Sequence, residues 1–122
     1  MEKHTYLCCL LDLYGALLTV RQRTLMEQHL YEDCSLFEIA EREGITRQGV
    51  RDALVRAEKE LTEAEEKLGF FHRNEAVKAA VKALEESVSK ALPVLPAQEK
   101  ETLLERMNSL KELCEESNNY GV

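Results

Sequence analysis

Hydrophobic residues recur along most of the chain at spacings of three and four positions, which is the period of an amphipathic α-helix. In the N-terminal part, these stripes cover residues 3–17, 20–31, 36–43 and 47–68. The expected inward positions of the first two stripes are Leu7, Leu10, Leu11, Tyr14, Leu17 and Leu18, then Val20, Leu25, Met26 and Leu30. No stretch shows the two-residue alternation of a β-strand. The pattern therefore predicts an all-α protein.

Local signals mark where these helices begin and end. Thr19 and Thr46 can act as N-caps, whose side chains accept hydrogen bonds from free backbone N–H groups of the first turn. Ser35 followed by Glu38 has the pattern of a capping box. Gly44 can adopt the positive φ with which a helix commonly ends. We therefore expect two short helices joined by a tight turn.

The stretch Ser35–Leu54 has the residue pattern of a DNA-binding helix-turn-helix. Ala40 is small where the two helices would cross. The apolar residues that a three-helix core would need are Ile39, Ile45, Val50 and Leu54. Gly49 is a poor helix former in the second helix. It either allows the close approach of a neighbouring backbone or is simply tolerated.

Candidate DNA-contacting residues lie in the first half of the fourth helix. They are Thr46, Arg47, Gln48, Arg51 and Arg56. Arginine can form two hydrogen bonds with guanine, and glutamine can do so with adenine. We expect Arg47, Gln48 and Arg51 on the face opposite Val50 and Leu54. The other interpretation is a stable trihelical core with solvated arginines, because Glu38, Glu41, Glu43 and Asp52 would repel a duplex if they faced it.

Two further arginines, Arg21 and Arg23, lie in the first turn of the second helix. Positive charge is unfavourable there because the helix dipole is positive at that end. The residues therefore either hold a phosphate or form a solvated helix start.

Helical patterning resumes after Gly69. We expect this glycine to end the fourth helix, residues 70–72 to form a connector, and Asn74 to cap a fifth helix over 75–92. Proline then interrupts helix over 92–96, and a sixth helix covers 97–117, with a frayed tail over 118–122. The expected inward positions are Ala76, Val77, Ala80, Val81, Leu84, Val88 and Leu92, then Leu103, Met107, Leu110 and Cys114.

The chain thus divides into a helix-turn-helix head over 1–70 and a helical arm over 71–122. The apolar stripes of the arm need a partner. They fold back on the long fourth helix, pair with a second copy of the chain, or both. We expect the arm to support a homodimer, since helix-turn-helix proteins often place two reading helices on two half-sites.

Composition, net charge and cysteine spacing make several classes of function less favoured. Of the 122 residues 44% are hydrophobic, and the net charge of −7 speaks against indiscriminate coating of nucleic acid. The four cysteines lack metal-ligand spacing, so we expect reduced residues and neither a metal nor a cofactor. No run approaches a membrane span, and no nucleophile pattern or phosphate loop is present. We therefore expect a cytoplasmic protein that is not an enzyme.

Several short motifs recur in the order and with the gaps of one family. They are Leu17-Leu18-Thr19, Arg21-Gln22, Tyr31-Glu32-Asp33, Ser35-Leu36, Glu38-Ile39-Ala40-Glu41, Gly44-Ile45-Thr46-Arg47-Gln48, Val50, Asp52 and the run Glu65–Leu68. From about Leu7 to Leu68 the chain resembles the YlxM family, small bacterial proteins described as helix-turn-helix regulators. The head is in turn similar to region 4 of sigma factors, which holds a promoter-reading helix. Gly49 departs from the alanine expected there, and the arm matches no motif of the family.

Members of this family are typically encoded beside the protein component of the signal recognition particle or beside its receptor. The resemblance therefore implies a DNA-binding transcription regulator linked to this secretion pathway. The alternative is a non-catalytic accessory protein that binds the particle's protein or RNA without binding DNA. Sigma region 4 surfaces also bind proteins, and an acidic arm would suit a basic partner.

Overall fold

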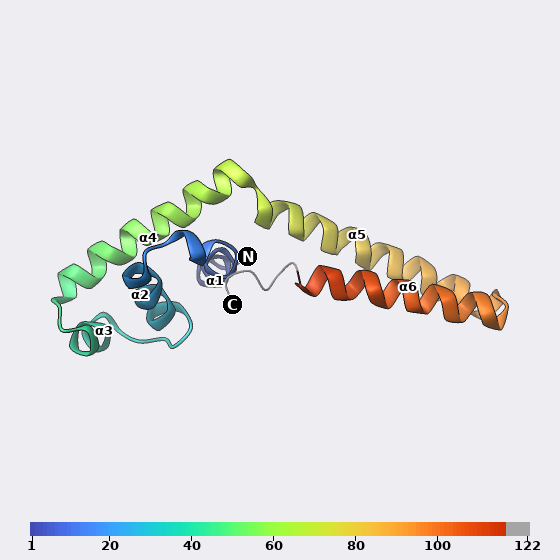
Figure 1. Ribbon diagram of the computed structural model, residues 1–122, viewed down its shortest axis with the longest axis horizontal. Coiled ribbons are helices and arrows are strands. Elements are labelled where there is room, and N and C mark those ends of the chain that lie inside the picture. The colour runs from blue at the N-terminus through green and yellow to red at the C-terminus, as the bar shows by residue number, and fades with distance from the viewer. Residues whose placement is uncertain (117–122) are drawn as a thin grey trace. The chain divides into compact units, whose positions relative to one another are not determined.

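The computed structural model describes residues 1–116, and all regular structure in that part of the chain is helical. The elements in order are α1 (Lys3–Tyr14), the 3₁₀ helix η1 (Gly15–Leu17), α2 (Val20–Leu30), α3 (Leu36–Glu43), α4 (Arg47–Leu68), α5 (Phe70–Ala91), the 3₁₀ helix η2 (Leu92–Val94) and α6 (Ala97–Glu116) (Figure 1). The all-α prediction is confirmed. The described residues form two compact units, a head over residues 1–71 and an arm over residues 72–116. The predicted frayed tail over 118–122 and the predicted end of the last helix at Ser117 lie outside the described residues.

The head is built around α4, which packs against α1, α2 and α3. Each of these four helices contributes a side chain that is 0% exposed, namely Leu10, Leu25, Ile39 and Val50. Burying a leucine of this kind contributes about 1.5–3 kcal/mol. The head therefore has a hydrophobic core to which every one of its helices contributes.

Two predicted inward positions in the head are wrong. Val20 is 84% exposed, because it lies five residues before the buried Leu25 and therefore about 140° away around α2. Leu17 is 66% exposed, because the α-helix ends at Tyr14 and the chain continues in the tighter 3₁₀ turn η1. That turn brings Leu18 into the core instead.

The start of α5 also differs from the prediction. Gly69 adopts a left-handed conformation with φ 66°, and α5 begins at the next residue, so residues 70–72 are not a connector. The Phe70 N–H donates to Tyr14 Oη at 3.1 Å, and the Phe71 N–H donates to Glu65 Oε1 at 2.9 Å. These oxygens satisfy N–H groups that a helix start leaves free. Asn74 is consequently inside α5 rather than at its cap.

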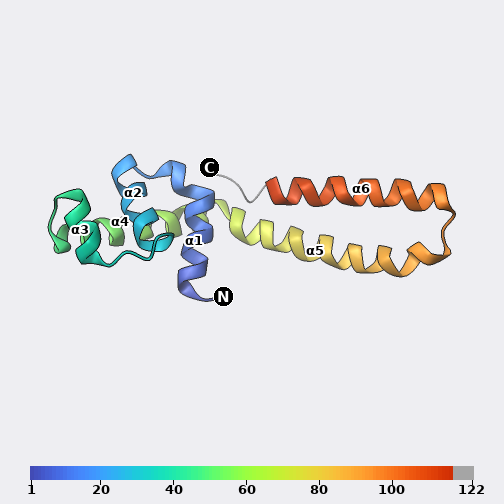
Figure 2. The same ribbon diagram turned by 90° about the horizontal axis from the view of Figure 1, so that it is seen from below.

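The arm consists of α5 and α6 packed antiparallel, as Figure 2 shows. Lys111 Nζ lies 3.1 Å from Glu85 Oε1 and joins the two helices. Met107 is buried, and the other predicted inward residues of α6, which are Leu103, Leu110 and Cys114, are half-buried. That stripe is confirmed.

The expected inward face of α5 is only partly covered. Half-buried members are Val81, Val88 and Leu92, whereas Ala76, Val77, Ala80 and Leu84 are exposed. A second helix can cover only one narrow stripe of its neighbour. The broad apolar face of α5 therefore remains largely open within the arm.

Candidate nucleic-acid interface

The helix-turn-helix predicted over 35–54 is present, and its caps are those expected. Ser35 Oγ accepts from the Glu38 N–H at 3.1 Å, and Glu38 Oε1 accepts from the Ser35 N–H at 3.1 Å. Gly44 ends α3 in the left-handed region with φ 65°. Thr46 Oγ1 then accepts from the Gly49 N–H at 2.9 Å and starts α4. These local bonds fix the angle at which α4 leaves the turn.

The inner side of this unit is apolar and closed. Ile39 and Val50 are fully buried, and Ala40 and Leu54 are 7% and 8% exposed. Because Val50 and Leu54 anchor α4 to the core, its outward face is determined. The position of every other residue around α4 follows from the helical turn.

The four predicted contact side chains of α4 are all exposed, as expected. They do not all lie opposite the core. Gln48 precedes Val50 by two positions and lies about 160° from it, whereas Arg47 and Arg51 are about 60° and 100° away and flank the core. Arg56 lies on the other flank, about 140° from Arg51. The expectation of a face opposite the core therefore holds for Gln48 alone.

Ion pairing separates these arginines from Arg23 and Arg42, whereas the exposed Arg21 also forms no ion pair within residues 1–115. Arg23 Nε lies 3.0 Å from Glu27 Oε1, and Arg42 Nη1 lies 3.2 Å from Glu32 Oε1. Within residues 1–115, Arg47, Arg51 and Arg56 form no ion pair. Their guanidinium groups are therefore available to an external anion without breaking an internal pair.

Gln48 has an internal partner. Its Nε2 donates to Asp52 Oδ1 at 2.9 Å, one turn further along α4. This exposed bond satisfies the amide and places the one acidic side chain of the first half of α4 beside it. A base edge would have to replace Asp52 as the acceptor.

Arg21 and Arg23 lie away from the start of α4. The intervening Gln22 completes a capping box with Thr19, and its Nε2 donates to Glu60 Oε1 at 3.4 Å. Glu60 is thirteen residues beyond Arg47, or about 20 Å along the helix axis. The structure therefore does not bring Arg21 and Arg23 together with the other candidates, and the anion beside Arg23 is the carboxylate of Glu27.

Two of the acidic residues expected to oppose DNA have internal roles. Glu38 serves in the capping box, and the hydrogen bond from the Ser35 backbone lowers its pKa. Glu43 is half-buried and accepts from Gln28 Nε2 at 2.9 Å. Gln28 is 6% exposed and was missed by the sequence reasoning, although its place among Leu25, Met26 and Leu30 on α2 could have revealed it.

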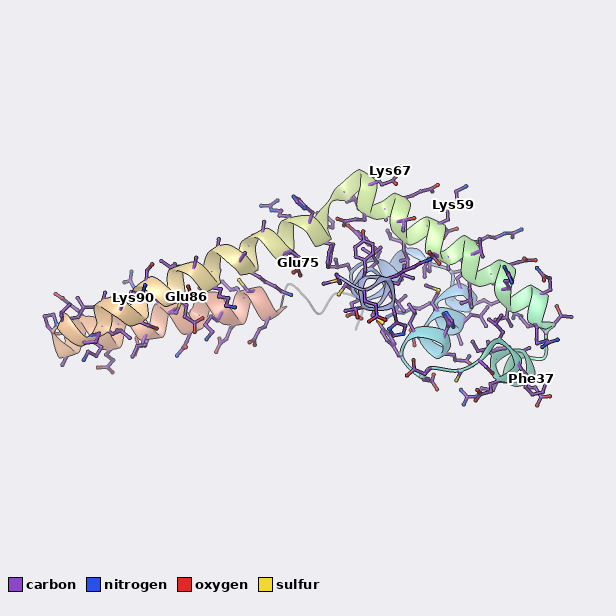
Figure 3. The ribbon with its side chains drawn as sticks, turned by 180° about the vertical axis from the view of Figure 1, so that it is seen from behind. Phe37, Lys59, Lys67, Glu75, Glu86 and Lys90 are labelled. Atoms are coloured by element: carbon purple, nitrogen blue, oxygen red, sulfur yellow. The ribbon has the colours of Figure 1, made fainter. Side chains whose placement is uncertain are left out.

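The second half of α4 has a different surface. Lys59 and Lys67 point outward from it in Figure 3. Five glutamates lie between residues 58 and 66 of the same segment. Lys59 Nζ lies 4.0 Å from Glu63 Oε1. Of the four basic side chains of α4 that form no ion pair within residues 1–115, Arg47, Arg51 and Arg56 precede Ala57 and only Lys67 follows it.

Metal clusters, disulfides and membrane spans are absent from the described part of the chain. No group of three histidine, cysteine or acidic residues within residues 1–115 could hold a metal ion. Cys8, Cys9, Cys34 and Cys114 form no disulfide. No helix among the described residues combines the length and apolar character needed to cross a membrane.

Comparison with known proteins supports the same interpretation of the fold. The family model UPF0122, described as "Putative helix-turn-helix protein, YlxM / p13 like", matches residues 1–102. A UPF0122 protein of Caldanaerobacter subterraneus is 42% identical over 83 residues, which are 68% of this chain and 71% of the relative. One from Bacillus pumilus is 34% identical over 110 residues, covering 90% of this chain and 97% of the relative.

The similarity is strongest over a shorter stretch. A UPF0122 protein of Desulforamulus reducens is 57% identical over 62 residues, which are 51% of this chain and 53% of the relative. The match thus spans about half the length of that relative. The family model nevertheless extends beyond Leu68, where the sequence resemblance was expected to end, and includes α5.

Proposed function

This chain belongs to the UPF0122 family of YlxM/p13-like helix-turn-helix proteins, and from that membership and the unpaired arginines of α4 we propose that its head binds duplex DNA. The observation that carries the proposal is the contrast in ion pairing. Arg23 and Arg42 are neutralised by glutamates, whereas Arg47 and Arg51 are exposed and have no acidic partner within residues 1–115. Exposed, unpaired arginines at the start of a reading helix suit the phosphates and base edges of DNA.

In this mode the first turns of α4 enter the major groove. Arg47 and Arg51 bind guanine or phosphate, and Gln48 exchanges its bond with Asp52 for a bond with adenine. Thr46 holds the helix start at the groove edge. Arg56 and Arg21 lie farther from the reading residues and contact phosphates, which position the protein without reading sequence. Arg23 joins them only when it exchanges its ion pair with Glu27 for a phosphate.

The proposal also includes where the protein acts and in which oligomeric state. The protein acts as a cytoplasmic transcription regulator and binds two half-sites as a homodimer held by the arm. The link to the signal recognition particle comes from the family resemblance alone. An acidic docking arm is less favoured, because residues 72–116 carry nine acidic and seven basic side chains and are nearly balanced.

The test compares Arg47→Ala/Arg51→Ala with wild type on a pool of random-sequence duplexes across a salt series. We expect the variant to bind at least about tenfold more weakly, and its log K against log salt slope to fall by up to about 1.8 for two lost phosphate contacts. The matched control is Lys59→Ala/Lys67→Ala, which removes the same charge from the same helix. That control should retain most of the affinity.

Wild-type protein that shows no salt-sensitive binding to the duplex pool would overturn the proposal. If such protein binds the signal recognition particle's RNA or protein instead, the accessory-protein alternative is supported. Equal losses in the two double variants would indicate a nonspecific charge effect and contradict a reading role for Arg47 and Arg51.

A further inference from the structure

The arm carries a groove that no other part of the described arm fills. It has a volume of about 680 Å³ and is lined by seven residues of the η2–α6 turn and the first half of α6. Leu95 and Leu103 form its apolar part, and Glu99, Thr102 and Arg106 form its polar part. Residues 99, 102, 103 and 106 are separated by three or four positions and therefore share one face of α6.

The two charged side chains of this groove, Glu99 and Arg106, are exposed and form no ion pair within residues 1–115. They are seven residues apart, which is about 10.5 Å along the helix. The two side chains form no ion pair with each other in the structure. The groove thus presents one negative and one positive charge on either side of Thr102 and Leu103.

Such a surface is complementary to itself. When two identical helices pair antiparallel across a twofold axis that passes between residues 102 and 103, residue 99 of one copy lies opposite residue 106 of the other. Each Glu99 then meets an Arg106, and each Thr102 meets a Leu103. A twofold interface requires this reciprocity, since the same patch is used on both copies.

Building on the homodimer put forward above, we propose that this groove is the dimer surface and that its occupant is α6 of a second copy. The Glu99–Arg106 pairs form twice and fix the antiparallel register. The contact is small, since seven lining residues compare with about 20–30 per partner in a standard interface. The dimer is therefore weak and reversible, and it dissociates on dilution.

The experiment exchanges the charges in the full-length chain and measures the dimer dissociation constant by sedimentation without DNA. Glu99→Arg alone and Arg106→Glu alone each place like charges opposite one another at two sites. Each should weaken dimerisation by about tenfold or more, because like charges across an interface are strongly unfavourable. The combined Glu99→Arg/Arg106→Glu chain is self-complementary again and should return to within about threefold of wild type.

Glu101→Arg is the matched control, because Glu101 is exposed on the same turn of α6 and does not line the groove. It should leave the dissociation constant nearly unchanged. Circular dichroism of each variant confirms that the helices are retained.

The outcomes separate the two proposals. Wild-type chain that stays monomeric at all concentrations would overturn the homodimer itself. A wild-type dimer that is insensitive to both single substitutions, or a double variant that fails to recover, would overturn only the assignment to this groove. DNA binding is absent from the assay, so failure of the DNA proposal leaves the result unaffected.

Discussion

The head and the arm use similar amphipathic helices but bury their apolar residues to very different extents. In the head, fifteen residues form one buried cluster. In the described part of the arm, only Met107 is buried. The difference lies in the number of neighbours, because α4 is covered by three helices while α5 and α6 have only each other as neighbours in the arm. A hydrophobic stripe in a sequence therefore predicts a helix face that can be buried. Whether that face is buried depends on how many neighbouring helices the fold places against it.

The largest expected effect tests this difference directly. Leu25→Ala removes a fully buried side chain of the head and should lower the free energy of unfolding by about 2–5 kcal/mol. Leu84→Ala removes a side chain of the arm that is 48% exposed and should cost less than about 1 kcal/mol. Urea denaturation measures both, and amide hydrogen exchange assigns each loss to the head or the arm. Equal costs would mean that another surface covers α5 in solution.

Much of the head could be predicted because its determinants are local. Thr19, Ser35 and Thr46 cap their helices with side chains that bond to backbone only three residues away, and Gly44 and Gly69 end helices by their own conformations. The bounds of α3 and α4 therefore follow from a few neighbouring residues. The exposure of Arg47 and Arg51 follows in turn from the buried Val50 and Leu54.

The errors at Val20 and Leu17 are local, but the start of α5 was wrong because distant residues decide it. The first N–H groups of α5 are satisfied by Tyr14, 56 residues earlier, and by the Glu65 side chain, so the helix needs no cap at Asn74. The candidate site shows the same limit. The helical spacing predicts that the α4 arginines are exposed. It does not predict that Glu32 pairs with Arg42 or that Gln28 donates to Glu43, because these partners come from another segment, residues 28–32.

The second prediction concerns this long-range cap. Tyr14 Oη donates to Glu65 Oε1 at 2.7 Å, and its removal in Tyr14→Phe should cost about 1–2 kcal/mol, because a hydrogen bond to a charged group is lost. The amides of Phe70 and Phe71 should exchange faster with solvent. Amides in the middle of α5 should be unaffected, since their hydrogen bonds lie within the helix.

The same tyrosine predicts a pH dependence. Burial, together with the hydrogen bond to Glu65, raises the pKa of Tyr14 from 10.0 to about 12. Its contribution to stability is therefore complete below about pH 10 and is lost as the pH rises from about 10 to 12. Urea midpoints of wild type should approach those of Tyr14→Phe across this range. A constant difference between the two proteins up to pH 12 would contradict the assignment.

The smallest expected effect is that of Gly49→Ala, where two opposing terms nearly cancel. Alanine favours helix over glycine by up to about 1 kcal/mol. In this place, however, a Cβ atom would lie 3.2 Å from Thr46 Oγ1, the atom that caps α4, and the cap would have to shift by a few tenths of an ångström. We expect the free energy of unfolding to change by less than about 0.5 kcal/mol. Ala79→Gly on the exposed face of α5 is the comparison in the arm. Because helix propensity is the main difference between the two residues at an exposed position, this substitution should lower the free energy of unfolding by close to 1 kcal/mol. A gain of 1 kcal/mol or more in Gly49→Ala would show that the Thr46 cap adjusts freely, and the start of the reading helix would then be less rigid than its hydrogen bonds indicate.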